Sequence, residues 1–396
     1  MFKAFKYRIY PNAKQEIILS KHFGGVRWIY NKGLELKVEA WTERSENLSR
    51  FDISAKIPEW KQSEETEWLK EVNSQSLQAS LVNLEMAYTR FFKSKNGFPR
   101  FKSKHSSRQS FQVPQSGVVG ENFVQIPKVG KIKAVISRPV EGKIKTITIS
   151  RTTTGKYFAS VLCDDGKELP TKLPVTEAGT IGIDLGIKEY AVLSTGERVA
   201  NPRNIKRSEV RLARAQRMLS RRVKGSANRA KQKLRVARIH EQCANRRNDF
   251  IHKLTTRLVR DNQTDSFAIE DLAVTNMVKN RRLAKAISDA SWGEFRRQFE
   301  YKSERAGKNV LVIGRFEPSS KSCSCGIVNK GLKLSDRVWT CVCGKTHDRD
   351  LLAARNIKRF ALHPQNSVGR VTPEFTPVET AVRRSTKQES GTSVPD

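Results

Sequence analysis

Two features are missing from this sequence of 396 residues: a long uncharged apolar run and an N-terminal secretory signal. No apolar stretch approaches the roughly 20 residues that a membrane-spanning helix needs, and the opening MFKAFKYRIYPN does not resemble a signal peptide. We therefore expect no membrane partner. We also expect a reducing compartment, in which clustered cysteines bind metal rather than form disulfides.

Acidic residues are also few relative to basic ones. The chain has 74 Lys and Arg residues against 40 Asp and Glu residues, a formal net charge of +34. Such an excess fits a long polyanion whose phosphates the protein neutralises. A basic amphipathic helix on a membrane surface is the alternative, but it would not account for basic residues along the whole chain. We predict a nucleic-acid partner, and the length allows two or three domains.

The N-terminal part combines helices with a small sheet. Alternating aromatic and basic residues predict a strand over residues 1–10. From Ser110 to Cys163, short alternating runs between Gly and Pro residues predict an antiparallel sheet or barrel. Residues 77–91 and 12–41 have apolar stripes at helical spacing. The stripe of the second range consists of Ile17, Ile18, Phe23, Val26, Ile29, Tyr30 and Leu34.

Residues 93–111 mix basic residues with three phenylalanines and contain both Gly and Pro. One hypothesis is a loop that lies along a phosphate backbone while its aromatic rings stack on bases. The other is a basic loop held in place by buried Phe98 and Phe101. The sequence favours neither.

Residues 180–200 predict three short strands, with Asp184 inside the first. Asp and Gly are both poor strand residues, so something other than β-propensity keeps Asp184 between nearby glycines. Metal coordination on an open face of the sheet is one hypothesis, and an Asp on an edge strand is the other. An actin-like ATPase fold begins with a similar hairpin, but it requires further glycine-rich phosphate loops, which this sequence lacks.

A strongly basic segment follows. From Arg203 to Arg238 there are fourteen Lys and Arg residues and one acid, Glu209. Apolar residues at helical spacing, from Val210 to Val223 and from Val236 to Leu254, predict two antiparallel helices that turn at Gly225 and Ser226. Because acids that could form i,i+4 ion pairs are nearly absent, we favour a nucleic-acid-binding surface over a solvated face.

Four cysteines form two close pairs, Cys323/Cys325 and Cys341/Cys343, and a glycine follows each pair. Two thiolate pairs supplied by tight turns are typical of a structural zinc ribbon, so we predict tetrahedral zinc at this position. His347 is either an alternative ligand or an exposed side chain.

Two acids follow the cysteines and begin a helix-forming stretch. Asp348 is placed to cap the helix, and Asp350 lies in its first turn, where the helix dipole favours an acid. Both residues therefore have a structural explanation. Asp350 is alternatively a ligand of Mg²⁺, which prefers carboxylate oxygens.

The order of elements in the second half predicts a ribonuclease H-like α/β fold. Three strands that carry Asp184 precede the helical hairpin, a strand that ends at Glu270, a helix over residues 284–306, a buried strand beginning at Asn309, and a last helix that carries Asp350. In that fold the three acids would converge and hold two divalent ions roughly 4 Å apart. The expected chemistry is Mg²⁺-dependent hydrolysis of a phosphodiester.

Several motifs resemble the TnpB (OrfB) family of insertion-sequence proteins, which is similar to type V CRISPR effectors. They are GIDLGIKEYAVLSTG, IEDL, RFEPSSKSCSCG and HDRDLLAARNI, with FKYRIYPNAKQ near the start and GFPRFKSK after it. The resemblance extends to about residue 362. Both cysteine knuckles are C-x-C, one residue shorter than the C-x-x-C that is usual in the family.

The resemblance implies four structural parts, to which the composition adds a tail, residues 363–396, that we expect to be disordered. The implied parts are a wedge-like β-barrel (1–10 and 105–170), a helical recognition lobe (11–104), a RuvC-like nuclease domain (176–320 and 348–362, with the hairpin insertion at about 203–260) and a zinc ribbon (321–347).

The function implied by the resemblance is an RNA-guided, Mg²⁺-dependent DNA endonuclease with Asp184, Glu270 and Asp350 as catalytic acids. Its partners would be a guide RNA from its own element and double-stranded DNA, cut beside a short element-defined motif. Its location would be the cytoplasm of a prokaryote, at the nucleoid when bound to DNA. Two alternatives stay open: a transposase that breaks and joins DNA directly, and a non-catalytic nucleic-acid-binding regulator.

Overall fold

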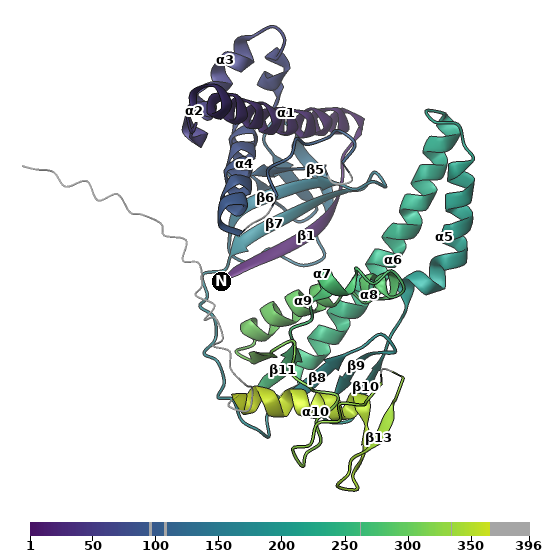
Figure 1. The fold of residues 1–396 in the computed structure, drawn as a ribbon. Coiled ribbons are helices and arrows are strands. Elements are labelled where there is room, and N and C mark those ends of the chain that lie inside the picture. Colours follow the sequence, from purple (N-terminus) through teal and green to yellow (C-terminus); the bar gives the residue numbers. More distant parts are fainter. Residues whose placement is uncertain (95–96, 107–108, 262, 334, 365–396) are drawn as a thin grey trace, which may run out of the picture.

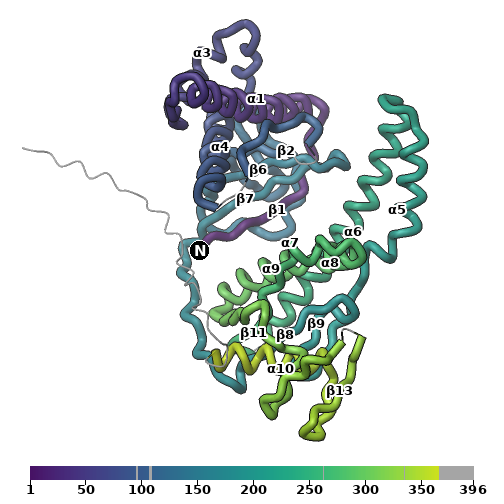
Figure 2. Tube along the Cα trace, viewed as in Figure 1, coloured from purple at the N-terminus to yellow at the C-terminus, as the bar shows by residue number. Residues whose placement is uncertain are grey.

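The chain folds into two halves joined by an extended segment, as the ribbon of Figure 1 and the tube of Figure 2 both show. This computed structural model describes residues 1–94, 97–106, 109–261, 263–333 and 335–364. The predicted disorder of residues 363–396 therefore falls almost wholly outside the described residues. Over the described ranges, no helix is long and apolar enough to cross a membrane.

A seven-stranded antiparallel sheet forms the base of the first half. Strand β1 (Phe2–Tyr10) lies inside it, between β7 (Tyr157–Asp164) and β5 (Gly130–Val135). Every second side chain from Phe5 to Ile9 is buried, which explains the alternation in the sequence. The prediction that the first strand and residues 110–163 form antiparallel strands is confirmed. The other strands are β2 (Gln109–Val113), β3 (Val118–Val119), β4 (Phe123–Ile126) and β6 (Lys143–Arg151).

Helices α1 (Ala13–Arg44) and α4 (Ser74–Ser94) pack against each other and against β2. Gly33 permits their close approach, because a Cβ at this position would lie 2.9 Å from Cδ2 of Leu81. Both helices were predicted, but Ile17 was wrongly included in the apolar stripe and is 60% exposed. Three short helical segments connect the two helices: α2 (Arg50–Ala55), α3 (Ile57–Gln62) and the 3₁₀ helix η1 (Glu67–Glu71).

The segment after α4 exposes two aromatic rings. Phe98 packs against Tyr88 and Phe91, with ring centroids 5.6 and 5.4 Å away, yet remains 48% exposed. Phe101 is 62% exposed. The hypothesis that buried Phe98 and Phe101 hold a basic loop in place is therefore wrong.

The second half is built on a five-stranded mixed sheet of order β10-β9-β8-β11-β12. Asp184 lies on the central strand, β8, so the hypothesis of an edge-strand Asp is wrong. The last strand was predicted to be buried, but it lies at the edge of the sheet and Val312 is 40% exposed. The strands are β8 (Thr180–Leu185), β9 (Glu189–Leu193), β10 (Arg198–Ala200), β11 (Ser266–Glu270) and β12 (Asn309–Ile313).

Helices cover both faces of this sheet. Ile183, Phe267 and Ile269 form a core with α6 (Ala227–Arg260) and α9 (Trp292–Arg305) on one face. The residues that alternate with them meet α10 on the other face. The expectation of an open face at Asp184 is therefore corrected, because α10 (Arg349–Leu362) lies across it.

The helix predicted over residues 284–306 is divided in two. Helix α8 (Ala284–Ala290) ends at Ser291, whose φ of 51° is left-handed, and α9 begins at the next residue. A short helix, α7 (Val274–Met277), precedes them.

The basic hairpin has the predicted form. Helix α5 (Asn204–Ser220) runs antiparallel to α6, and Ser226 caps α6 by accepting from the N–H of Arg229 at 3.1 Å. Val210 and Val223, predicted as apolar-stripe residues, are instead 81% and 76% exposed. In Figure 1 the hairpin rises from the second half beside the first.

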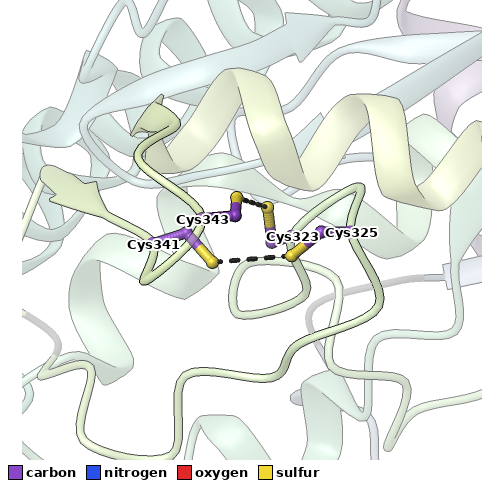
Figure 3. Close-up of side chains that lie close together, drawn as sticks. All are labelled: Cys323, Cys325, Cys341 and Cys343. Carbon is purple, nitrogen blue, oxygen red and sulfur yellow. Dashed lines mark hydrogen bonds between the residues drawn. The ribbon is translucent and has the colours of Figure 1, made fainter.

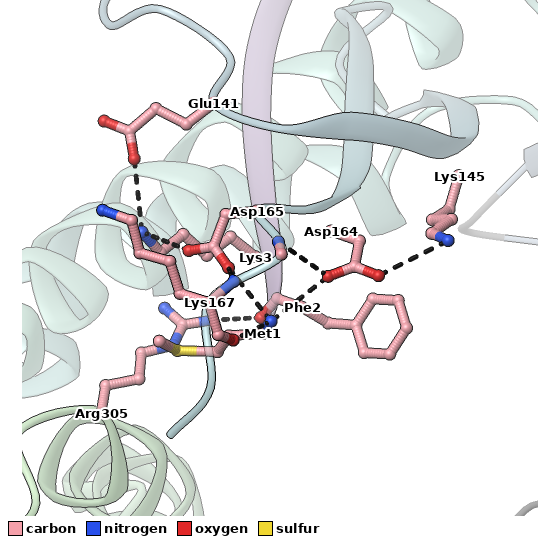
Figure 4. Close-up of polar contacts among 10 residues, drawn as sticks. Met1, Phe2, Lys3, Glu141, Lys145, Asp164, Asp165, Lys167 and Arg305 are labelled. Atoms are coloured by element: carbon pink, nitrogen blue, oxygen red, sulfur yellow. Dashed lines mark hydrogen bonds and ion pairs between the residues drawn. The ribbon is translucent and has the colours of Figure 1, made fainter. Parts of the chain in front are cut away.

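Polar contacts between described residues join the two halves at the turn between β6 and β7 and at the start of β1. Glu241 on α6 accepts from Thr154 Oγ1 at 2.9 Å and from Lys156 Nζ at 2.8 Å. At the start of β1, Arg305 of α9 donates to the carbonyl of Phe2 at 2.8 Å (Figure 4).

Ion pairs hold the start of β1 in place. Lys3 Nζ lies 2.9 Å from Asp165 and 3.3 Å from Glu141, as Figure 4 shows. The hydrogen bond from Lys3 lowers the pKa of Asp165. These pairs fix the strand that Arg305 contacts.

Candidate metal centres

The three acids singled out in the sequence line one cavity of about 920 Å³ in the second half. Asp184 lies near the end of β8, Glu270 ends β11, and Asp350 lies in the first turn of α10. The structure therefore brings together side chains from three elements that are far apart in the chain.

The sheet register places the first two acids side by side. Strands β8 and β11 are parallel, and Ile183 is opposite Ile269. Asp184 and Glu270 are the next residues on the two strands, so they face the same side of the sheet. Neighbouring strands are about 4.8 Å apart, which is close enough for two carboxylates to interact.

Gly182 brings the third acid to the same place. A Cβ on Gly182 would lie 2.0 Å from the carbonyl oxygen of Ala354, so only glycine lets α10 approach β8 this closely. Ala354 lies one helical turn after Asp350, and Gly182 lies two residues before Asp184. Four residues of a helix and two residues of a strand both span about 6 Å. The contact at Gly182 therefore places Asp350 of α10 close to Asp184 of β8.

Asp348 has the capping role predicted for it. Its Oδ1 accepts from the N–H of Leu351 at 2.9 Å and also lies 2.9 Å from Arg198. The cap fixes the first turn of α10, which contains Asp350.

Asp184 and Glu270 have raised pKa values even though cationic side chains, Arg337 and Arg349 among them, line the same cavity. Burial raises the pKa of Asp184 to about 7, and the charges of Asp350 and Glu270 add to the shift. Burial also raises the pKa of Glu270 to about 7, helped by Asp271. These shifts indicate a pocket in which negative charge is costly, and a bound cation would remove that cost.

Two arginines already neutralise the acid next to Glu270. Asp271 pairs with Arg296 at 2.7 Å and with Arg315 at 2.6 Å. Asp350 pairs with Arg337 at 3.2 Å. Among these acids, Asp184 and Glu270 are therefore the two with strongly raised pKa values.

The four cysteines form a second and tighter centre. Their Sγ atoms all lie within 4.8 Å of one another (Figure 3), and no other set of three or more His, Cys, Asp or Glu ligand atoms in the described ranges is grouped for one ion in this way. The three carboxylates line a cavity of about 920 Å³ instead. Cys323 is 3.7 Å from Cys343, and Cys325 is 3.6 Å from Cys341.

Glycine makes the short C-x-C knuckles possible. The N–H of Gly326 donates to the carbonyl of Cys323 at 3.1 Å, and that of Gly344 to Cys341 at 2.8 Å. Their φ angles of +91° and +82° are left-handed, a region that glycine enters without strain. Two equivalent turns therefore present both cysteine pairs in spite of the shorter spacing.

His347 lies beside the cysteines rather than in solvent. Its Nε2 is 3.1 Å from Cys323 Sγ, and its ring packs 4.8 Å from that of Trp339. Hydrogen bonds from the backbone N–H of Cys325 and from His347 hold the pKa of the Cys323 thiol below its usual range. This favours the thiolate, the form that binds zinc.

The cysteine centre and the acidic cavity share helix α10. Leu352 packs in one cluster with Cys323, Trp339 and Cys341. The side chain of buried Asn356 donates to the carbonyls of Ser319 and Ser322, at 2.6 and 2.7 Å. The ribbon's two strands, β13 (Val338–Thr340) and β14 (Thr346–Asp348), lead directly into the helix.

Sequence reasoning missed Gly182, Arg337 and Asn356 as residues that shape these sites. The glycines near Asp184 were noticed, and the rule that a strand glycine signals a close backbone approach could have identified Gly182. Arg337 and Asn356 act through contacts between distant segments, for which the sequence carries no local signal.

Comparison with known families identifies the family of this chain. A family model described as "Probable transposase" matches residues 163–281, a "Cas12f1-like, TNB domain" matches residues 292–357, and a "Helix-turn-helix domain" matches residues 1–46. A protein of Streptomyces pristinaespiralis named "Putative RNA-guided DNA endonuclease" is 44% identical over 392 residues, which cover 98% of this chain and 96% of that protein. The chain belongs to the TnpB (OrfB) family.

A second relative of this TnpB-family chain is "Putative RNA-guided DNA endonuclease InsQ" of Escherichia coli (strain K12). It is 34% identical over 373 residues, which cover 90% of this chain and 91% of that protein. In this TnpB-family chain, residues 1–46 contain strand β1 and the single long helix α1 rather than a helix-turn-helix.

Two solved structures with the same fold are CRISPR effectors. The Cas12f1 chain of a complex with single guide RNA and target DNA matches 90% of this TnpB-family chain and 98% of its own length, with a TM-score of 0.55 at 13% identity. The mini-RNA-guided endonuclease Cas_phi3 matches 91% and 92%, with a TM-score of 0.51 at 10% identity. At these identities the similarity shows the fold alone.

The raised carboxylate pKa values predict how pH acts on the metal-free protein. The folded-state pKa of Asp184 lies above its usual 3.8, so the folded state holds extra protons between about pH 4 and pH 7. The free energy of unfolding should therefore fall as pH rises through this range. Asp184→Asn should raise it by about 2 kcal/mol at pH 8, measured by urea unfolding without added Mg²⁺.

The matched control is Asp249→Asn, which removes the same charge from a carboxylate that is 62% exposed on α6. It should leave the pH dependence unchanged. Adding Mg²⁺ at pH 8 should stabilise the unaltered protein more than Asp184→Asn. Equal pH profiles for all three proteins would contradict the account of this cavity.

The close contact at Gly182 predicts that adding one methyl group there destabilises the protein. Gly182→Ala should lower the free energy of unfolding by about 1–3 kcal/mol, because α10 has to move away from β8. The control is Gly293→Ala in α9, where a Cβ has no neighbour within 4 Å and should be tolerated. A Gly182→Ala variant as stable as the control would disprove the close contact.

The cysteine cluster predicts one structural metal ion. Cys341→Ser should abolish bound zinc, measured by elemental analysis, and lower the melting temperature, as a strong chelator should do to the unaltered protein. Val342→Ser, a neighbouring side chain that is 87% exposed, should change neither. Zinc-free protein with an undiminished melting temperature would count against the ribbon.

Proposed function

We propose that this chain is an RNA-guided, Mg²⁺-dependent DNA endonuclease encoded by an insertion sequence. Two relatives that cover most of the chain carry RNA-guided DNA endonuclease in their names, and the fold is that of Cas12 effectors. The five-stranded sheet with α10 is its ribonuclease H-like (RuvC) nuclease domain. Asp184, Glu270 and Asp350 are its catalytic acids.

The observation that carries this proposal is the acidic cavity in a basic protein. A chain with a net charge of +34 would bind DNA more tightly if basic residues lay at every point of contact. Three acids nevertheless line one cavity at the end of the sheet. Carboxylates repel a phosphodiester unless divalent cations lie between them. Burial and mutual repulsion, which raise the pKa of Asp184, support a donor set suited to such cations.

Each acid has a definable part. Asp184 and Glu270, side by side on parallel strands, would hold the ions from one side, and Asp350 would hold them from α10. Two Mg²⁺ ions about 4 Å apart supply an activated water and stabilise the leaving oxygen. Lys321 also lines the cavity, where its charge can bind a phosphate of the strand, and Arg315 and Arg337, which pair with Asp271 and Asp350, lie there too.

The rest of the chain would bind and orient nucleic acid. The helices of residues 11–104 form a recognition lobe, the seven-stranded sheet a wedge-like domain, and the hairpin of α5 and α6 a basic wall. Base pairing with a guide RNA from the same element would select the sequence, while the protein reads backbone shape and a short flanking motif. Zinc at the four cysteines is structural, because it holds the ribbon against α10.

Two other functions predict different products. A transposase acting directly would produce strand-transfer products on a mini-transposon without guide RNA. A non-catalytic regulator would bind its RNA and target yet cut nothing in Mg²⁺. The intact set of three acids favours cutting over regulation alone.

The decisive substitution is at the central acid. Asp184→Ala should abolish cleavage of a matched target in the presence of guide RNA and Mg²⁺, because the ions lose a ligand. Binding of guide RNA and target should remain within about twofold of the unaltered protein, measured by gel shift. The RNA for this assay is the one that copurifies with the protein.

The control for this assay is Asp249→Asn, which lies on α6 outside the acidic cavity. It should cut at the normal rate. Loss of binding and cutting together in Asp184→Ala would mean that Asp184 is a structural residue. Full cutting by Asp184→Ala would disprove the assignment of the nuclease centre.

A further inference from the structure

One face of helix α1 lines a cavity of about 360 Å³ that the proposed nuclease centre does not use. The helix contributes residues at intervals of three and four, so they form one stripe on the side opposite the buried core. Trp68 and Phe101 complete the lining. The helix residues are Gly24, Arg27, Trp28, Asn31, Lys32 and Glu35.

Phe101 is exposed at this cavity because its neighbours hold it there. The side chain of Asn31 donates to the carbonyl of Lys102 at 3.0 Å and accepts from the N–H of Lys102 at 2.8 Å. The ammonium group of Lys102 lies 3.7 Å from the ring centroid of Tyr30. The backbone and the side chain of Lys102 thus both hold the loop against α1, although the Phe101 ring is 62% exposed.

Two tryptophans, Trp28 and Trp68, line the cavity and form its aromatic wall. Trp28 packs edge-on against Trp60, with ring centroids 5.3 Å apart. Trp28, Trp60 and Trp68 are all partly buried against the core of the first half. An exposed ring held in place and a supported aromatic wall are the parts of a stacking site.

Gly24 has no packing role that explains it. Gly25 and Gly33 of the same helix sit against side chains, 3.0 Å from Val72 and 2.9 Å from Leu81 for an added Cβ. At Gly24 an added Cβ would meet nothing within 4 Å, although glycine weakens a helix interior. Gly24 lines the cavity, so we expect an added methyl group to project into it.

A basic cavity of about 730 Å³ adjoins the aromatic one. Arg27 lines both, and the second also contains Lys21, Lys104 and Arg151. Glu16 lies there too, and Lys21 pairs with Glu71, so the positive charge is only partly compensated. A phosphate backbone in the basic cavity would pass Arg27 and bring a base to the aromatic rings.

We propose that the α1 cavity binds one unpaired nucleobase, stacked between Phe101 and the wall formed by Trp28 and Trp68. Its volume lies at the lower end of the roughly 300–1,000 Å³ typical of small-ligand pockets. Arg27 binds the adjoining phosphate, and the Lys32–Glu35 ion pair, 2.9 Å long, forms the polar edge of the pocket. The proposal rests on the proposed function only in that the ligand is a nucleic acid.

Oligonucleotide binding to the full chain tests this. The probes are one short sequence as single-stranded RNA, as single-stranded DNA and as a duplex, with 2-aminopurine as the unpaired base. Phe101→Ala should weaken binding of at least one single strand by roughly 5- to 100-fold and restore 2-aminopurine fluorescence, because a stack is lost. Duplex binding should be unchanged, and the strand that loses affinity identifies RNA or DNA as the source.

Gly24→Ala separates the site from folding defects. This variant should melt at the same or a higher temperature than the unaltered protein, yet bind the same single strand more weakly. Phe51→Ala, which truncates a ring that is 70% exposed on α2, is the matched control and should bind normally. Arg27→Gln should reduce the salt dependence of binding by about one unit of slope.

Three results would overturn the pocket. These are single-strand affinities of Phe101→Ala and Gly24→Ala equal to that of Phe51→Ala, equal losses on duplex and single strand, or no binding of either single strand by the unaltered protein. Failure of the nuclease proposal looks different, since it would be a lack of cleavage with guide RNA, whatever the oligonucleotide affinities.

Discussion

The close contact of α10 with β8 at Gly182 is the constraint on which the second half depends. It leaves no room for a side chain between the helix backbone and the strand. The same helix is capped by Asp348, packed against the cysteine ribbon through Leu352, and tied by Asn356 to the loop that enters the ribbon. These three contacts, with the one at Gly182, therefore hold the helix that carries Asp350, as preorganisation of the proposed metal site requires.

Basic and acidic residues are placed differently in this protein. Basic residues occur in both halves and the hairpin, which suits a polyanion, but at the carboxyl ends of β8 and β11 the chain places acids whose pKa values are raised by burial and by neighbouring carboxylates. Such a cavity is unfavourable for the metal-free protein near neutral pH. Bound cations would remove this unfavourable charge. The free energy of unfolding that the acids lower in the metal-free protein would then be recovered when the ions bind.

Much of this could be predicted from the sequence, because local patterns specify it. Four features depend only on residues that are close in sequence: the alternation at Phe5 to Ile9, the stripe of α1, the hairpin turn at Gly225 and the paired cysteines. Errors arose where tertiary context decides. Ile17 and Val210 fit helical stripes but face solvent, and β12 is apolar but lies at an edge. Arg337 beside Asp350, and the pocket between α1 and Phe101, depend on distant segments meeting and had no local signature.

Calorimetric titration of the metal-free protein with Mn²⁺, an ion suited to carboxylate ligands, measures the central assignment most directly. If Asp184, Glu270 and Asp350 form a two-ion centre, the unaltered protein should bind two ions per chain at this centre, and Glu270→Gln should lose at least one of them. Saturable binding that is identical in the two proteins, or no saturable binding at all, would contradict the account.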